Sequence, residues 1–159
     1  MRLKNILNGI DVLKIINRKN IDIKSITHIS KDVIAGSMFI CLKGGNFNGN
    51  DYIDEVVRNG ARCILTDDEL SLDLLSVEKY KNIVFVLIKD VRSVMSFVAK
   101  NFYNRCVDDL EVVGIIGTSG KTTTSLMLSQ IMSEYDNNIG VIGTNGIFIG
   151  NIVLDNKFM

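Results

Sequence analysis

Short apolar runs alternate with helical patterns along the first hundred residues. Val, Ile, Phe and Thr dominate the runs, and turn residues or helical spacing separate them. This pattern predicts strands at 25–30, 37–42, 61–66 and 82–88. Between the second and third runs, residues 51–59 place Ile53, Val56 and Val57 on one helical face, and Gly60 follows as a stop. A small α/β domain with a strand–helix–strand unit is therefore expected.

A second helix is predicted after the run at 82–88. Apolar residues recur at helical spacing from Val91 to Phe102, and Asp90 is placed to cap the first turn. The helix should end near Tyr103. We expect the domain core to form around Phe39, Ile40, Val56, Ile64, Val84 and Val98.

Polar residues at 104–109 end this pattern and predict a domain boundary near residue 108. The β-branched run 110–116 is typical of a strand buried on both faces of a parallel sheet. Apolar positions between Leu126 and Tyr135 then predict a helix, and 138–143 the next strand. The expected domains are 1–108 and 109–159, the second an incomplete parallel sheet with one βαβ unit at 110–143.

Composition narrows the possible classes. The 159 residues are 47% hydrophobic and 23% charged, which is typical of a folded globular protein. Eighteen basic and eighteen acidic residues cancel, so we expect no nucleic-acid partner and no membrane partner, although a local site for an anionic small molecule is possible. No segment has a signal-peptide core or a membrane-spanning length, which predicts a cytoplasmic protein. We expect a monomer.

Several reactive residue types have structural interpretations. Cys41, Cys63 and Cys106 form no CxxC pair and are expected to be reduced, buried thiols. His28, the single histidine, lies in the run 25–30 without a Cys/His cluster, which favours a structural or surface role. The acidic cluster 67–69 is interpreted as a solvated turn.

The segment GTSGKTTT, residues 117–124, lies between a predicted strand and a predicted helix and indicates a phosphate-binding loop. Gly117 and Gly120 allow backbone N–H groups to surround phosphate oxygens, and the helix adds its positive N-terminal end. The predicted nucleotide contacts are Gly117, Thr118, Ser119, Gly120, Lys121, Thr122 and Thr123. Lys121 can reach the β- and γ-phosphates of ATP, and the Thr122 hydroxyl is placed to bind Mg²⁺.

The loop departs from the strict GxxxxGK[ST] form, because Ile115 stands where its first glycine should be. A glycine-rich connection with Lys and Thr present by chance is the alternative. The GKTTT run in its strand–helix setting argues against it.

The stretch GIIGTSGKTTT, residues 114–124, resembles the Mur ligases, whose loop has the form G-x-x-G-T-x-G-K-T-T-T. Residues 87–114 are similar to the segment that these enzymes carry before the loop, with Cys106 where a proline is usual. Residues 30–67 are similar to their UDP-binding N-terminal domain. The resemblance implies that domain 1–108 binds the UDP substrate and that domain 109–159 begins the ATP-binding domain.

The same resemblance implies substrate contacts at Ser30, Lys31, Gly49 and Asn50. Ile29, Ser30 and Lys31 stand where the family has Asp-Ser-Arg, and residues 48–50, Asn-Gly-Asn, where it has Asp-Gly-His. The Gly- and Asn-rich residues 44–50 can be a plain surface loop or can read a uracil edge.

Within the family, IGTNG at 142–146 resembles the MurE type, which adds lysine or meso-diaminopimelate to UDP-MurNAc-L-Ala-D-Glu. The resemblance implies an ATP-dependent ligase that forms an acyl phosphate, with Lys121 as the catalytic residue. It covers about the first third of such an enzyme, so the chain alone is expected to be inactive. A MurF-type ligase, a non-catalytic nucleotide-binding remnant and an unrelated P-loop phosphotransferase are the alternatives.

Overall fold

The computed structural model describes residues 1–45, 47–69, 80–136, 138–150 and 152–154. The chain divides into two compact units, 1–110 and 111–159. This division lies two residues beyond the position predicted from the sequence, 108. The functions expected of the two domains stay predictions.

The first unit is built on a five-stranded sheet with the order β1-β5-β4-β3-β2. The strands are β1 (Val12–Ile16), β2 (Ser25–Thr27), β3 (Ser37–Ile40), β4 (Cys63–Thr66) and β5 (Val84–Ile88). Strands β2 to β5 are parallel neighbours, and β1 pairs antiparallel with β5 at the edge. The four runs predicted from the sequence are confirmed as β2 to β5. His28 lies just beyond β2 and is exposed.

Alternate residues of the central strands face opposite sides of the sheet, as the two-residue period of a strand requires. On one side, Ile40 and Val84 pack with Val98 in one core cluster. On the other side, Phe39 and Ile64 pack with Val56 in a second cluster. All six predicted core residues are at least 97% buried. Because strands β3 to β5 are buried on both faces, their sequences are apolar except for the buried Ser37 and Thr66.

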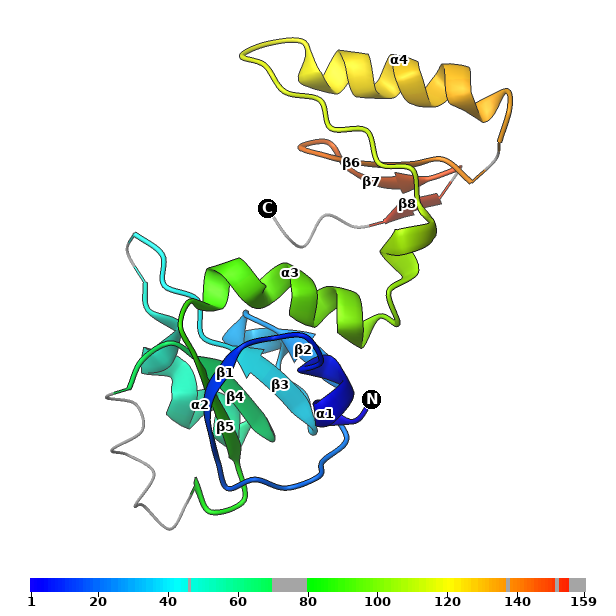
Figure 1. The fold of residues 1–159 in the computed structure, drawn as a ribbon. Coiled ribbons are helices and arrows are strands. Elements are labelled where there is room, and N and C mark those ends of the chain that lie inside the picture. Colours follow the sequence, from blue (N-terminus) through cyan, green and yellow to red (C-terminus); the bar gives the residue numbers. More distant parts are fainter. Residues whose placement is uncertain (46, 70–79, 137, 151, 155–159) are drawn as a thin grey trace. The chain divides into compact units, whose positions relative to one another are not determined.

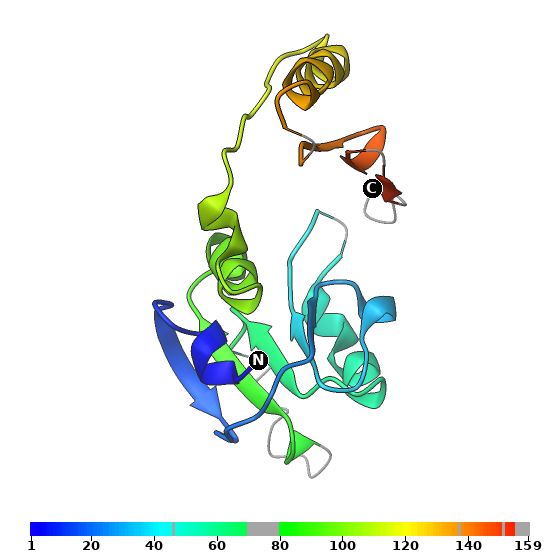
Figure 2. The same ribbon diagram turned by 90° about the vertical axis from the view of Figure 1, so that its right-hand side faces the viewer.

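Helices cover both faces of this sheet. Helices α1 (Leu3–Ile6) and α3 (Val91–Phe102) pack on the first cluster, and α2 (Ile53–Arg58) packs on the second. Figure 2 shows α1 and α3 on one side of the strands and α2 on the other. Helix α3 begins as predicted, because the Asp90 side chain accepts a hydrogen bond from the Arg92 N–H at 2.9 Å. Gly60 follows α2 at φ 103°, a value that favours glycine.

A tight connector follows α3 and leads out of the first unit. Asn104 and Arg105 have φ values of 55° and 59°, and the 3₁₀ turn Cys106–Asp109 comes next. The Asp108 carboxylate forms ion pairs with Lys100 of α3 and with Arg105. Cys106 is exposed in this turn, which corrects the expectation of a buried thiol, whereas Cys41 and Cys63 are buried in the sheet as expected.

The second unit contains α4 (Lys121–Ser133) and a three-stranded sheet of β6 (Gly140–Gly143), β7 (Gly146–Ile149) and β8 (Ile152–Leu154) (Figure 1). The helix after the loop and the strand at 138–143 were both predicted. The run 110–116 was predicted as a buried strand, and this is wrong for the described residues. It pairs with no described strand, and Val112 and Ile116 are 80% and 96% exposed. The predicted βαβ unit is absent from the described residues, because 110–116 forms no strand and β6 pairs antiparallel with β7.

The described residues of the second unit bury no large apolar side chain. Every buried hydrophobic residue of the described chain lies at or before Val98. Val112, Val113, Met127, Ile131 and Tyr135 are all exposed. The folding free energy of this unit therefore lacks the apolar burial that stabilises the first. No helix among the described residues is long and apolar enough to cross a membrane.

Candidate functional site

The predicted phosphate loop lies in the second unit, between the unpaired run 110–116 and α4. Gly117 and Gly120 have φ values of 151° and 77°. A Cβ at Gly120 would meet no atom within 4 Å, so the backbone conformation and not crowding favours glycine there. Gly120 is the residue before α4, whose first-turn N–H groups have no partner within the helix. A phosphate group placed there would meet these N–H groups and the positive end of the helix.

Lys121 is exposed and folds back over the loop, where its Nζ donates to the Gly117 carbonyl oxygen at 2.6 Å. Thr118, Ser119 and Thr123 are also exposed, whereas Thr122 is half-buried. The Thr122 Oγ1 lies 3.5 Å from Thr144 Oγ1, in the turn between β6 and β7. The structure thus brings the predicted loop residues together. Thr144 lies within the IGTNG segment, residues 142–146, and was not predicted as a site residue.

The two hydroxyl oxygens are of the kind that can serve as ligands of a Mg²⁺ ion. Thr122 and Thr144 are hard oxygen donors, and Mg²⁺ takes many of its ligands from phosphates and water. Among the described residues, no group of three His, Cys, Asp or Glu side chains could hold a metal without such phosphates.

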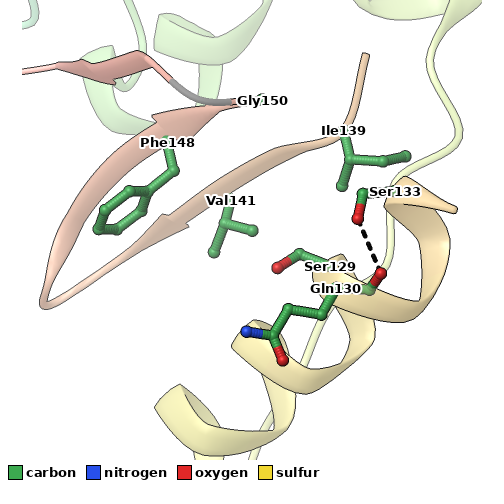
Figure 3. A pocket seen from close by; sticks show the side chains of 7 residues that line it. All are labelled: Ser129, Gln130, Ser133, Ile139, Val141, Phe148 and Gly150. Carbon is green, nitrogen blue, oxygen red and sulfur yellow. Dashed lines mark hydrogen bonds between the residues drawn. The ribbon is translucent and has the colours of Figure 1, made fainter. Parts of the chain in front are cut away.

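A cavity of about 550 Å³ lies elsewhere in the second unit, between the C-terminal half of α4 and strands β6 and β7. Figure 3 shows Ser129, Gln130 and Ser133 on one side of it and Val141 and Phe148 on the other. The serine hydroxyls donate to backbone carbonyls of their own helix. The cavity is far along α4 from the phosphate loop at its N-terminal end, so it is not the nucleotide site.

The predicted substrate residues lie at the carboxyl edge of the first unit's parallel strands. Ser30 and Lys31 are in the 3₁₀ turn Ser30–Asp32 after β2, and Gly49 begins the 3₁₀ turn Gly49–Tyr52 after β3. Strands β2 and β3 are parallel neighbours, so both turns belong to the same edge of the sheet. Ligands of open α/β sheets bind at such edges. Ser30 is half-buried and Lys31 is exposed.

Gly49 and Asn50 are held from within the protein. The Gly49 N–H donates to the Leu42 carbonyl oxygen at 2.8 Å, and a Cβ at Gly49 would come within 2.8 Å of the Cys41 Cα. The Asn50 side chain donates to Asn48 Oδ1 at 2.9 Å and accepts from the Thr66 hydroxyl at 2.7 Å. Both residues therefore shape the loop, and Asn46 lies outside the described residues.

The acidic cluster 67–69 is solvated only in part, which corrects the sequence interpretation: Glu69 is exposed, whereas Asp67 is held within the protein. The Asp67 side chain is 19% exposed, and its Oδ1 lies 3.3 Å from Lys43 Nζ. That oxygen is buried and accepts no hydrogen bond in the described part of the chain, so the contact with Lys43 is an ion pair. The Asp67 Oδ2 accepts from the Val91 N–H at 3.3 Å. These contacts are long-range, and no local sequence pattern indicated them.

The two buried thiols, Cys41 and Cys63, are not reactive groups. Burial raises the pKa of Cys63, and burial together with the negative charge of Asp67 and Asp68 raises the pKa of Cys41. Both thiols are therefore protonated and poor nucleophiles at neutral pH.

Relatives of this chain include ligases named for the addition of diaminopimelate. UDP-N-acetylmuramoyl-L-alanyl-D-glutamate–2,6-diaminopimelate ligases of Clostridioides difficile (strain 630) and Alkaliphilus oremlandii (strain OhILAs) are 34% and 36% identical over 94% and 95% of this chain. The chain spans 29% of the length of each.

Solved structures agree on the fold. MurF from Acinetobacter baumannii has a TM-score of 0.68 at 21% identity, with 90% of this chain and 30% of that chain covered. MurF ligase from Thermotoga maritima in complex with ADP has a TM-score of 0.58 at 26% identity, with 77% and 26% covered. The first likeness concerns the fold alone.

The region that matches a known family includes the carboxyl edge of the parallel strands and the run 110–116 that precedes the glycine loop. The Mur ligase family, catalytic domain, matches residues 22–117, from just before β2 to the first glycine of the loop. Because this match extends over more than half of the 159 residues, the chain belongs to the Mur ligase family.

Proposed function

We propose that this chain is part of an ATP-dependent ligase that joins diaminopimelate to UDP-MurNAc-L-Ala-D-Glu. The similarity that carries this proposal is to ligases named for that reaction, at 34% and 36% identity over nearly the whole chain. The phosphate loop, with Lys121 and the N-terminus of α4, supports ATP as the second substrate. The sequence allowed either lysine or diaminopimelate as the added amino acid, and the names of these relatives favour diaminopimelate.

In the proposed reaction, the γ-phosphoryl group of ATP passes to the substrate carboxylate and gives an acyl phosphate and ADP. The amino group of diaminopimelate then attacks the acyl carbon, and phosphate leaves as the amide forms. Lys121 would release the Gly117 carbonyl and place its charge against the transferring phosphoryl group. Thr122 would hold Mg²⁺, which withdraws charge from the phosphate oxygens.

The uridine end of the substrate is assigned to the carboxyl edge of the first unit, at Ser30, Lys31, Gly49 and Asn50. Ser30 and Lys31 supply a hydroxyl and a cation that are not fully buried. The Gly49 N–H and the Asn50 side chain already form hydrogen bonds within the protein. These two residues would therefore contribute the shape of the loop and their remaining backbone groups to the site. We further propose that the protein is a cytoplasmic monomer. We also propose that it binds neither nucleic acid nor membranes, and the balanced charge supports this second point.

Titration of residues 1–159 tests the substrate assignment. UDP-MurNAc-L-Ala-D-Glu should shift the amide signals of Ser30 and Gly49, and Mg-ATP should shift those of residues 117–123. A guanosine nucleotide serves as the control for the uridine site. Unchanged signals at Ser30 and Gly49 under saturating UDP substrate would reject that site.

A MurF-type ligase is the second candidate, because MurF enzymes are among the solved structures with this fold. Its substrate carries a tripeptide where the first candidate's carries a dipeptide. Turnover by the longer protein with the UDP-dipeptide and diaminopimelate favours the first candidate, and turnover with the UDP-tripeptide and D-alanyl-D-alanine favours the second.

A further inference from the structure

Asp67 joins three loops that follow three neighbouring parallel strands. Lys43 lies after β3, Asp67 after β4, and Val91 opens α3 after β5. One Asp67 carboxylate oxygen lies 3.3 Å from Lys43 Nζ, and the other accepts from the Val91 N–H at 3.3 Å. A single side chain therefore connects the start of loop 43–50 to the start of a helix 48 residues later in the sequence.

Two further contacts fix the same loop from outside. Arg92 donates from Nη2 to the Lys43 carbonyl oxygen at 2.9 Å, so α3 holds the first residue of the loop twice, directly and through Asp67. At the other end, the Thr66 hydroxyl donates to Asn50 Oδ1 and accepts from the Asp68 N–H. The end of β4 and the start of α3 thus anchor both ends of loop 43–50.

The described residues of the loop also close on themselves. Lys43 and Asn48 form an antiparallel bridge, and the Gly44 N–H donates to the Phe47 carbonyl oxygen at 2.9 Å. These contacts tie the described residues of the loop to Lys43 and Asn48. Its position on the sheet edge therefore depends on Lys43 and Asn50.

Helix capping accounts for only one of the two Asp67 carboxylate oxygens. Asp67 Oδ2 accepts from the Val91 N–H at 3.3 Å, and Asp90 accepts from the next N–H, that of Arg92, at 2.9 Å. Asp67 Oδ1 is buried and has no hydrogen-bond donor among the described residues, which costs desolvation free energy that an ion pair with a half-exposed lysine offsets only in part. A carboxylate kept at this cost is more readily explained by positioning than by stability.

We propose that Asp67, assisted by Arg92, is a positioning residue that, through Lys43, sets Gly49 and Asn50 for the uridine part of the substrate. This inference rests on the proposed function, because it assigns the substrate to Gly49 and Asn50. Neither side chain is required to touch the ligand.

The test compares Asp67→Asn with Asp90→Asn in residues 1–159. Both changes remove one negative charge at the start of α3, and asparagine caps a helix as well as aspartate does. Uridine diphosphate is the probe for affinity, and hydrogen exchange of the Gly49 amide reports the order of the loop without ligand. Asp67→Asn should weaken uridine diphosphate binding roughly fivefold and speed Gly49 exchange about as much, since the ion pair with Lys43 is lost while the amide oxygen can still accept from the Val91 N–H. Asp90→Asn should change neither.

Arg92→Met gives a second, independent measurement, because this exposed side chain holds Lys43 through one hydrogen bond. It should speed Gly49 exchange in the same direction. Equal effects of Asp67→Asn and Asp90→Asn, or unchanged Gly49 exchange in Asp67→Asn, would overturn the positioning role. If uridine diphosphate fails to bind the unaltered chain, the proposed function fails instead, and Gly49 exchange still decides whether Asp67 holds the loop.

Discussion

At the scale of single residues, Lys121 allows function to be separated from folding. Its side chain is exposed, and its one described hydrogen bond is to the Gly117 carbonyl of the loop itself. Lys121→Ala should weaken Mg-ATP binding roughly tenfold to a hundredfold, since a charge-assisted contact to phosphate is lost. The urea midpoint should stay unchanged. Lys4→Ala, at another exposed lysine, is the control, and equal ATP affinity in the two variants would remove Lys121 from the site.

Gly49 shows the opposite case, a predicted contact residue whose substitution affects the fold. An alanine Cβ there would lie 2.8 Å from the Cys41 Cα and the Leu42 nitrogen, which are backbone atoms that cannot turn aside. Gly49→Ala should lower the free energy of unfolding by about 2 kcal/mol through overpacking. Gly45→Ala, where a Cβ meets nothing within 4 Å, should be nearly neutral in the same urea titration. A stable Gly49→Ala variant would contradict this close approach.

At the scale of elements, the fully buried strands were the ones that the sequence predicted best. Strands β3 to β5 were predicted because both of their faces are buried and their sequences are mostly apolar. Strand β1 was missed because it is an edge strand with Leu13 and Lys14 exposed. The run 110–116 has the composition of a buried strand, but composition cannot supply the neighbouring strands that would bury it.

In the candidate site, the residues that are contiguous in the sequence were predicted, and those that are distant in the sequence were not. The phosphate loop was predicted because its glycines, Lys121 and Thr122 are contiguous in the sequence. Thr144 lies 22 residues beyond Thr122, and Asp67 lies 24 residues from both Lys43 and Val91. Only the topology of the sheet brings such residues together, so a linear pattern carried no signal for them.

The connector after α3 should loosen in acid. Hydrogen bonds from Lys100 first and Arg105 second hold the pKa of Asp108 below its ordinary value. A lowered pKa contributes stabilisation that is complete above the ordinary value, about pH 4, and is lost as the pH falls through the lowered value. Backbone order at 104–109, measured by heteronuclear relaxation, should therefore decrease in that acid range. Asp108→Asn should abolish this transition and Asp109→Asn should retain it. A transition that survives in Asp108→Asn would assign it to another carboxylate.

At the scale of the whole molecule, the two units differ in what stabilises them. The first has two apolar clusters, one on each face of its sheet. The described part of the second has no buried large apolar side chain. Limited proteolysis of residues 1–159 should therefore leave a stable fragment that ends near residues 108–110. Cleavage within β3 to β5 at the same rate as within α4 would contradict the independent stability of the first unit.

The same difference predicts that residues 1–159 alone form no peptide bond. Catalysis of acyl transfer depends on two substrates held against a fixed set of charges. Here the run that leads into the phosphate loop is exposed and pairs with no described strand, so packing does not fix the loop N–H groups. Incubation with Mg-ATP, UDP-MurNAc-L-Ala-D-Glu and diaminopimelate should therefore give no ADP release that depends on the amino acid. Lys121→Ala is the control for contaminating ATPases. If the unaltered segment shows diaminopimelate-dependent turnover that Lys121→Ala abolishes, these residues carry a complete catalytic site, and the exposed run must acquire its neighbours when substrate binds.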